Sequence, residues 1–242
     1  MLLIEAGGSD RKLIIRAPLA SVQQWGTSLD WGYETDPEPG CAHRRITQHA
    51  GRVLGGTSAM NAMVWVKGSN LDYDGWQLPG WAWNDVAPVF ARIEAGPMRI
   101  TRVPYPDELS ERFVAAARAA GVAADDDVSG PDLDGAAISP VSIHHGQRWT
   151  TARGYLRHQK NLTVVTKAEV RRLIIRNGRA VGVEYRRRGR AQQAFADHEV
   201  IVSAGAYGTP HVLQLSGIGP ADHLRGRDHP ARRKSPHRRR PH

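Results

Sequence analysis

A pair of adjacent glycines inside one apolar segment constrains the chain most. In residues 51–65 (GRVLGGTSAMNAMVW), Gly55-Gly56 is followed by two hydroxyl residues, Thr57 and Ser58. Glycine allows positive φ and lets a backbone approach a ligand closely, because no Cβ intervenes. Since Thr57 and Ser58 are good N-cap residues, the pattern predicts a helix whose first N–H groups could seat a phosphate or an anionic ring. A glycine-rich turn before a buried helix explains the segment equally well.

A short apolar strand that ends in an acid stands at the start of the sequence. Leu2-Leu3-Ile4 is followed by Glu5 and then by Gly7-Gly8. In dinucleotide-binding folds, an acid at the end of the second strand binds the adenosine ribose. A solvated strand-terminal glutamate is the alternative. The Gly-x-Gly-x-x-Gly phosphate turn belongs about 20–30 residues before such an acid. The sequence contains no such turn, so we expect the first strand, the turn and the first helix to be missing.

Two long motifs, taken together, resemble one enzyme family. The first signature of the glucose-methanol-choline (GMC) oxidoreductases resembles residues 51–74, at Gly51, Asn61, Trp65, Gly68 and Asp74. Residues 205–219 (GAYGTPHVLQLSGIG) are similar to the second signature. The resemblance implies an α/β fold: a partial FAD-binding Rossmann-like domain with part of a substrate domain. It also implies FAD as cofactor and oxidation of an alcohol of the choline type, with hydride transfer to flavin N5.

The resemblance also implies which residues contact FAD. Glu5 would bind the ribose, Val170 would hold the adenine through its backbone, and the turn at Gly205 would approach the cofactor. An ordinary strand valine remains the alternative for Val170. The complete set of expected cofactor residues is Glu5, Arg52, Val53, Gly55, Gly56, Thr57, Asn61, Val64, Val170, Ala204 and Gly205.

No catalytic residue can be assigned. In the family, a histidine in the carboxyl-terminal third accepts the hydroxyl proton, and none of the eleven histidines matches that motif. We also expect no metal. Asp125-Asp126-Asp127 lacks the spacing of a calcium loop, and the adjacent His144 and His145 would point away from each other in a strand.

Several secondary-structure elements are expected outside the signatures. Residues 11–49 are predicted to be irregular, and residues 70–83 an aromatic-rich turn region. Helices are predicted from an Asn84 cap, over 106–120, and over a short stretch capped by Thr150 or Thr151 that ends near Leu156. Strands are predicted at 161–166 and in a hairpin of 170–175 and 180–186, joined by Asn177-Gly178. A buried strand over 199–206 is expected to lead into a helix capped by Thr209, with Pro210 at its first position.

The last seventeen residues differ in composition from the rest. Residues 226–242 contain seven Lys and Arg against one Asp, which accounts for +6 of the formal net charge of +9. Such a segment cannot bury enough surface to fold. We expect residues 1–225 to form the partial FAD-binding domain, with substrate-side insertions within roughly 70–150, and 226–242 to be a disordered basic tail of aberrant origin. A basic arm for nucleic acid is the less favoured interpretation.

Composition limits location and activity. No apolar run approaches the ~20 residues of a membrane span, and the single Cys41 excludes an internal disulfide. We therefore expect a cytoplasmic protein. The leading hypothesis is an inactive fragment of an FAD-dependent dehydrogenase, whose complete form oxidises a small alcohol and passes electrons to an unknown acceptor. A non-enzymatic, pseudogene-like product or a basic-tailed nucleic-acid-binding protein is the alternative.

Overall fold

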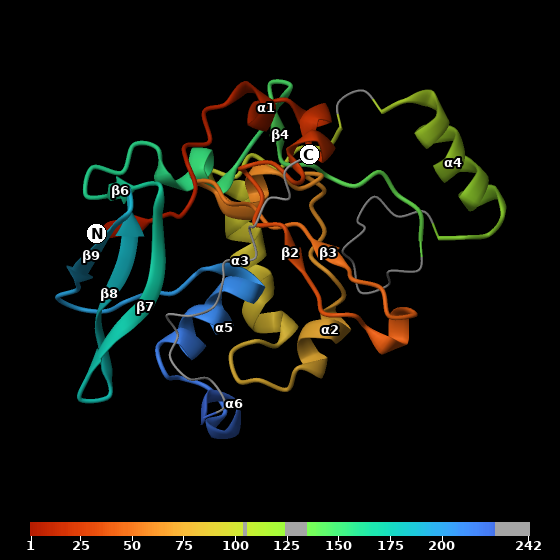
Figure 1. Ribbon diagram of the computed structural model, residues 1–242. Helices are drawn as coiled ribbons and strands as arrows, with labels where there is room; N and C mark the ends of the chain where they lie inside the picture. The colour runs from red at the N-terminus through yellow and green to blue at the C-terminus, as the bar shows by residue number, and fades with distance from the viewer. Residues whose placement is uncertain (104–105, 124–134, 226–242) are drawn as a thin grey trace. The chain divides into compact units, whose positions relative to one another are not determined.

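The computed structural model describes residues 1–103, 106–123 and 135–225 (Figure 1). The basic tail and Asp125-Asp126-Asp127 lie outside these residues. The chain divides into two compact units. Unit 1 contains Met1–Ser9, Gly26–Leu54 and the described residues from Asn161 onward, and unit 2 contains Asp10–Trp25 and Gly55–Lys160.

A parallel strand pair in unit 1 joins segments that are far apart in the sequence. Strand β1 (Leu2–Ile4) runs parallel to β6 (Thr163–Val165), with Leu2 opposite Thr163. Both strands were predicted, and β1 is half-exposed rather than buried. Glu5 comes directly after β1. A parallel strand pair with an acid at the end of one strand is the arrangement of a Rossmann-like sheet, so this part of the expected fold is confirmed.

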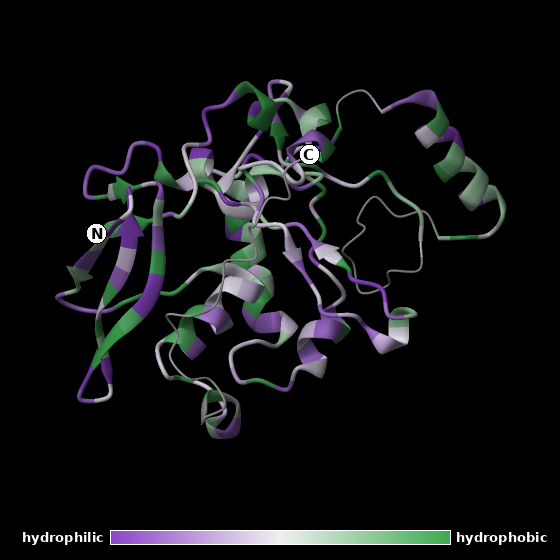
Figure 2. Cartoon of the chain, in the orientation of Figure 1, coloured by the Kyte–Doolittle hydropathy of each residue, from purple (hydrophilic) through white to green (hydrophobic). Residues whose placement is uncertain are grey.

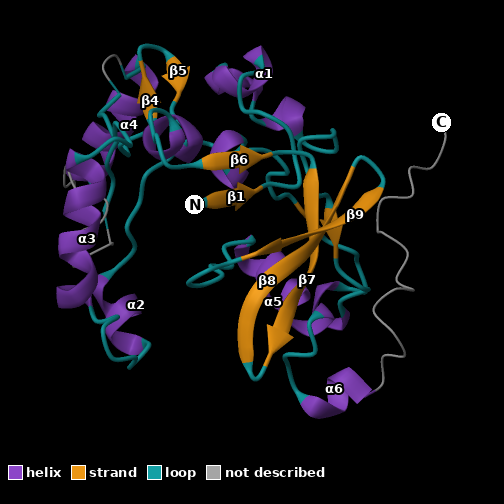
Figure 3. Ribbon diagram, turned by 90° about the vertical axis from the view of Figure 1, so that its left-hand side faces the viewer, coloured by secondary structure: helices purple, strands orange, loops and turns teal. Residues whose placement is uncertain are grey.

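An antiparallel three-stranded sheet is the largest sheet among the described residues of unit 1 (Figure 3). Strands β7 (Ala168–Arg176) and β8 (Arg179–Arg187) make the predicted hairpin. Asn177 and Gly178 both have positive φ, 49° and 74°, as the tight turn of a twisted hairpin requires. Strand β9 (Arg190–Phe195), which was not predicted, pairs with β8.

The helix after the second glycine turn begins earlier than predicted. Helix α5 (Gly205–Leu215) starts at Gly205, so Thr209 and Pro210 lie inside it and the predicted Thr209 cap is wrong. The Thr209 hydroxyl instead accepts a hydrogen bond from the Ala204 N–H (3.0 Å). The buried strand expected over 199–206 is also wrong. Among the described residues no strand pairs with it, and Ile201 is 72% exposed.

Short elements complete unit 1. They are the antiparallel pair β2 (Tyr33–Glu34) and β3 (Thr47–Gln48), the 3₁₀ helix η3 (Pro39–Cys41) and helix α6 (Ala221–Arg225). The irregular character predicted for residues 11–49 is confirmed, because no element in that range exceeds four residues. The core of the unit is formed by Leu29, Val53, Ala168, Leu173, Tyr185 and Val212.

Unit 2 consists of helices and one small hairpin (Figure 1). Its first elements are α1 (Leu13–Arg16), η1 (Pro18–Ala20), η2 (Val22–Gln24), η4 (Gly56–Ala59), α2 (Asn70–Gly75) and α3 (Trp83–Ala95). They are followed by α4 (Glu108–Ala119), β4 (Ile143–His144), β5 (Gln147–Arg148) and the π-helical turn η5 (Ala152–Leu156). Ile15, Ala59, Met60, Met63 and Met98 form the core.

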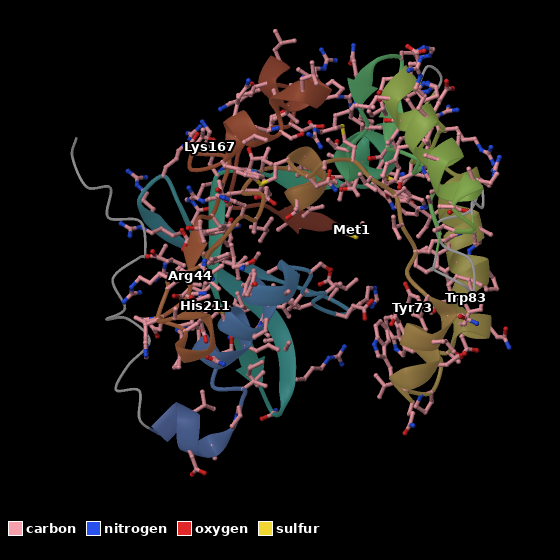
Figure 4. All side chains as sticks on the ribbon, turned by 90° about the vertical axis from the view of Figure 1, so that its right-hand side faces the viewer. Met1, Arg44, Tyr73, Trp83, Lys167 and His211 are labelled. Atoms are coloured by element: carbon pink, nitrogen blue, oxygen red, sulfur yellow. The ribbon has the colours of Figure 1, made fainter. Side chains whose placement is uncertain are left out.

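The helices of unit 2 differ from the predictions mainly at their starts. The region expected to be an aromatic turn contains α2, because Ser69 accepts from the Leu71 N–H (3.2 Å) and Asp72 accepts from the Ser69 N–H (3.1 Å). Helix α3 begins at Trp83, so Asn84 is not its cap; Tyr73 and Trp83 lie side by side, with ring centroids 5.6 Å apart (Figure 4).

Helix α4 agrees with the predicted helix over 106–120 to within two residues at its start and one at its end, and Asp107 caps it by accepting from the Ser110 N–H (3.0 Å). Hydrophobic residues alternate with hydrophilic ones along it (Figure 2). Leu109 and Phe113 are 76% and 69% exposed, so within the described part of unit 2 its apolar face is uncovered. None of the described helices is long and apolar enough to cross a membrane.

Candidate functional site

Glu5 lies in a turn that the backbone holds on both sides. Its N–H donates to the Val165 carbonyl (2.9 Å), and its carbonyl accepts from the Ala168 N–H (2.9 Å). Its Oε1 accepts from the Gly7 N–H (2.6 Å). Burial raises the pKa of Glu5, while the Gly7 N–H and the Arg52 guanidinium lower it. One carboxylate oxygen is therefore used by the turn, and Oε2 is left to accept from a ligand hydroxyl.

The turn after β1 packs directly against the backbone of the first signature. A Cβ built on Gly7 would lie 1.8 Å from the Arg52 carbonyl oxygen, so only glycine fits there. Gly8 forms a parallel bridge with Val53, which is fully buried, and the Leu54 N–H donates to the Gly8 carbonyl (2.9 Å). This contact explains why the sequence requires glycine after the acid.

An aromatic and charged cluster surrounds the Arg52 side chain. Its guanidinium lies over the Trp31 ring (5.0 Å to the centroid) and 3.9 Å from the Glu169 carboxylate. The Tyr33 ring stacks on Trp31 (5.9 Å) and contacts the Tyr207 ring (5.3 Å). Burial and the Glu169 charge raise the pKa of Tyr33, and Arg52 lowers it.

Sequence reasoning did not select Trp31, Tyr33 or Tyr207 for the site. The signal that could have found them is the alternation of two aromatic residues, at positions 31 and 33, in an extended segment whose side chains at i and i+2 share one face.

The other expected cofactor residues of unit 1 lie on β7 and at the start of α5. Val170 is half-buried and pairs with Tyr185 of β8. Ala204 and Gly205 form the entry to α5, where Gly205 has a φ of 81° that disfavours other residues. A Cβ on Gly208 would lie 3.1 Å from the Ala204 Cβ, so small residues are needed along this turn.

The diglycine loop of unit 2 is a short 3₁₀ turn rather than the start of a longer helix. Helix η4 ends at Ala59, its N-cap is Gly55, and no side chain caps it. The prediction that Thr57 and Ser58 cap a helix is therefore wrong. The Ser58 hydroxyl instead donates back to the Gly55 carbonyl (2.6 Å), an alternative to capping that is open to short hydroxyl side chains.

The N–H groups of the two glycines remain available to a ligand. Gly55 and Gly56 have φ values of 96° and 56°. Within the part of the chain that the structure describes, neither N–H has a hydrogen-bond acceptor. The opposite side of the loop is closely packed, because a Cβ on Gly55 would lie 3.3 Å from the Ala152 Cβ. Consecutive free N–H groups in positive-φ backbone form a concavity suited to an anionic or carbonyl-bearing group.

Asn61 and Val64 follow the loop. The Asn61 side-chain oxygen accepts from the Met63 N–H (3.1 Å) and from the buried Arg148 (3.0 Å). Val64 is 52% exposed and its backbone bridges to Val141. Arg148, whose side chain is fully buried, was not recognised from the sequence.

The histidine pair does not have the predicted arrangement. The His144 and His145 rings lie 4.0 Å apart, because the chain leaves the strand at His145, where φ is 49°. Burial and the charges of His145, Arg99 and Arg153 lower the pKa of His144. Among the described residues no group of His, Cys, Asp or Glu could hold a metal ion.

The expected cofactor residues are divided between the two units. Glu5, Arg52, Val53, Val170, Ala204 and Gly205 belong to unit 1, and Gly55, Gly56, Thr57, Asn61 and Val64 belong to unit 2. Each unit contains features that fit part of a dinucleotide: a carboxylate oxygen free to accept from a ribose in unit 1, and two free N–H groups in unit 2.

Comparison with known proteins identifies the family. The GMC oxidoreductase family profile matches residues 3–231. The chain therefore belongs to the GMC oxidoreductase family, and the resemblance read from the two signatures is confirmed. Members of this family are FAD-dependent oxidoreductases.

The alignments with individual relatives span nearly all of this chain but less than half of each relative. An oxygen-dependent choline dehydrogenase from Rhizobium etli is 38% identical over 245 residues, which cover 93% of this chain and 44% of the relative. An uncharacterized GMC-type oxidoreductase from Mycobacterium bovis is 38% identical over 250 residues, covering 94% and 47%. The structure of pyridoxine 4-oxidase from Mesorbium loti superimposes with a TM-score of 0.85 at 31% identity, covering 93% of this chain and 48% of that one.

Proposed function

We propose that this chain is the FAD-binding part of an oxidoreductase that acts on CH–OH donors. The observation that carries the proposal is the turn after β1, where Gly7 can only be glycine and Glu5 keeps one carboxylate oxygen free. The family assignment and the similarity to a choline dehydrogenase support the same function. We propose a small alcohol of the choline type as the substrate; the electron acceptor is left open.

Different residues of the chain would contact different parts of FAD. Glu5 Oε2 would accept hydrogen bonds from the ribose hydroxyls, as acids at this position do in dinucleotide-binding folds. The Gly55 and Gly56 N–H groups would donate to the flavin side, and Arg52, Val53, Thr57, Asn61 and Val64 would surround it. Val170, Ala204 and Gly205 would approach through backbone. FAD, when bound, supplies the acceptor for the hydrogen on the alcohol carbon.

The chain is proposed to bind and orient the cofactor without completing the reaction. A general base must lie within about 3 Å of the proton that it removes, directly or through one water. None of the described histidines carries the family's motif for that role, so we propose that the isolated chain does not oxidise alcohols. The proposed domain boundaries remain 1–225, with substrate-side insertions within roughly 70–150. The free Cys41 suits a reducing compartment, and on that ground we propose a cytoplasmic location.

FAD titration of the purified 242-residue chain tests the proposal. Quenching of flavin fluorescence should reveal weak, saturable binding, which Glu5→Ala should weaken by about tenfold, as loss of a charge-assisted hydrogen bond predicts. The exposed Glu108→Ala serves as the matched control and should leave affinity unchanged. Choline and simple primary alcohols should not reduce an electron-accepting dye. Absence of FAD binding at millimolar concentration, or alcohol-dependent dye reduction, would contradict the proposal.

A further inference from the structure

Arg148, at the end of β5 in unit 2, is a buried cation with an unusual set of partners. Its side chain is fully buried. Nε donates to the Ile15 carbonyl (3.0 Å) and Nη2 to the Ser21 hydroxyl (2.5 Å). Nη1 donates to the Asn61 carbonyl (2.6 Å), the Asn61 side-chain oxygen (3.0 Å) and the Ser58 carbonyl (3.4 Å).

All of these acceptors are neutral. Within the described residues no carboxylate forms a hydrogen bond or ion pair with Arg148. Burial lowers the pKa of Arg148 to about 10, so the guanidinium remains charged at neutral pH. Burying a charge without a counter-ion is costly. The planar guanidinium carries five N–H donors in one plane, a geometry that lysine cannot supply.

What the fork holds is the diglycine loop. Ser58 and Asn61 accept three of the five hydrogen bonds from Arg148; Ser58 lies in η4 and Asn61 two residues after its end. The adjacent segment holds the start of the loop: the Thr151 hydroxyl donates to the Gly55 carbonyl (3.2 Å), and the Thr151 N–H donates to the Ser58 hydroxyl (3.0 Å). The carbonyls of Gly55, Ser58 and Asn61 are thus all turned toward residues 148–151.

The C=O and N–H of one planar trans peptide group point in opposite directions. The Gly55 carbonyl bonds to the Thr151 and Ser58 hydroxyls, so the Gly56 N–H points away from them. We propose that Arg148 is the positioning residue of the FAD-binding loop: it fixes Ser58 and Asn61, and Ser58 in turn bonds the Gly55 carbonyl, whose peptide group carries the Gly56 N–H. Arg148 does not touch the cofactor; it acts through the loop. This inference rests on the proposed function for its ligand, but the locking of the loop can be measured without any ligand.

Hydrogen exchange of the ligand-free chain gives the first test. The Met60 and Asn61 N–H groups donate to the Thr57 carbonyl (3.0 and 2.9 Å), and the Met63 N–H donates to Asn61, so all three should exchange slowly. In Arg148→Met these amides should exchange about tenfold faster, while α3 is unchanged. Arg112→Met, which removes an exposed arginine of α4, is the matched control and should behave like the unchanged chain. Equal exchange in Arg148→Met and the unchanged chain, or faster exchange throughout unit 2, would overturn the proposal.

Arg148→Lys covers the case in which Arg148→Met does not fold. It keeps the charge and most of the stem but loses the fork. We expect the same three amides to exchange faster than in the unchanged chain and circular dichroism to stay unchanged. Full protection in Arg148→Lys would show that charge alone suffices, and the proposal would fail.

FAD titration of the same variants separates this inference from the proposed function. Affinity should fall at least fivefold in Arg148→Lys and not in Arg112→Met. A loosened loop with unchanged FAD affinity would overturn Arg148 as a positioning residue for the cofactor. If the unchanged chain binds no FAD, the proposed function and its cofactor role for Arg148 both fail, whereas the exchange experiment still decides whether Arg148 locks the loop.

Discussion

Gly7 and Arg52 approach so closely that a Cβ on Gly7 would lie 1.8 Å from the Arg52 carbonyl oxygen. The obstacle is backbone and cannot rotate away, so the turn after β1 and the first signature must separate if Gly7 acquires a side chain. Because Glu5 accepts from the Gly7 N–H in the same turn, this separation would also move the proposed ribose carboxylate.

Gly7→Ala should therefore destabilise unit 1 strongly. We expect the free energy of unfolding to fall by about 3 kcal/mol or more, the upper range for overpacking. Gly8→Ala is the matched control, since nothing lies within 4 Å of a Cβ there and its φ is not positive. Urea denaturation followed by circular dichroism measures both. Equal stability of the two variants would show that the turn relaxes at little cost.

The diglycine loop predicts a graded response to alanine. Gly55→Ala meets both a φ of 96°, outside the left-handed region, and a contact of 3.3 Å to Ala152. Gly56→Ala meets a φ of 56° and open space. We expect losses of about 3 kcal/mol and about 1 kcal/mol respectively. Thermal and urea unfolding of the two variants test the order, and a larger loss at Gly56 would contradict the loop geometry.

Glu5 should make stability depend on pH. Burial raises its folded pKa above the unfolded value of about 4.3, despite the Gly7 N–H and Arg52. Its contribution to stability is thus fully present below the unfolded pKa and is lost as pH rises through the folded pKa. Glu5→Gln should remove this loss, so relative to the unchanged chain it gains stability as pH rises above the unfolded pKa of about 4.3. Glu108→Gln, on exposed α4, should show no such gain. A pH-independent difference at Glu5 would refute the burial argument.

Asp30 should have the opposite dependence. Burial raises its pKa, but hydrogen bonds from the Gly26, Gly32 and Ala50 N–H groups and from His49 outweigh burial and hold the pKa below its ordinary range. Stability from this carboxylate is present above the unfolded pKa of about 3.9 and is lost as pH falls. Asp30→Asn should lower the free energy of unfolding by about 3 kcal/mol at pH 7, because the new side-chain NH2 group would face a backbone N–H. The cost should shrink at pH 3, as urea titrations at both values can show.

Local signals in the sequence predicted the elements whose causes are local. Asn177-Gly178 specifies the β7–β8 hairpin through positive φ at two neighbouring residues, and the helical spacing of Leu109, Phe113 and Ala116 predicted α4. The predicted strand over 199–206 depends instead on a neighbouring strand, and none of the described strands pairs with it. The helix predicted after Gly56 ends at Ala59, because the backbone leaves helical geometry at Met60, where φ is −138°.

The candidate site was predicted in part for the same reason. Motifs located Glu5 and the diglycine loop, because those residues act through their own backbone neighbourhood. Arg148 escaped prediction because its partners come from Ile15, Ser21, Ser58 and Asn61, far apart in the sequence. Because arginine is mostly exposed in proteins, the sequence alone predicts a surface position for a lone arginine in a strand.

The parallel pairing of β1 with β6 also orders events during synthesis. β1 leaves the ribosome about 160 residues ahead of its partner, and at about 5–20 residues per second it waits roughly 8–30 s for a neighbour. The long segment of unit 2, Gly55–Lys160, emerges entirely within that interval. Unit 1 needs the described residues up to 225, so a nascent chain that has passed Lys160 should carry a complete second unit while the first is still incomplete. During the wait for β6, chaperones can bind the edge of β1.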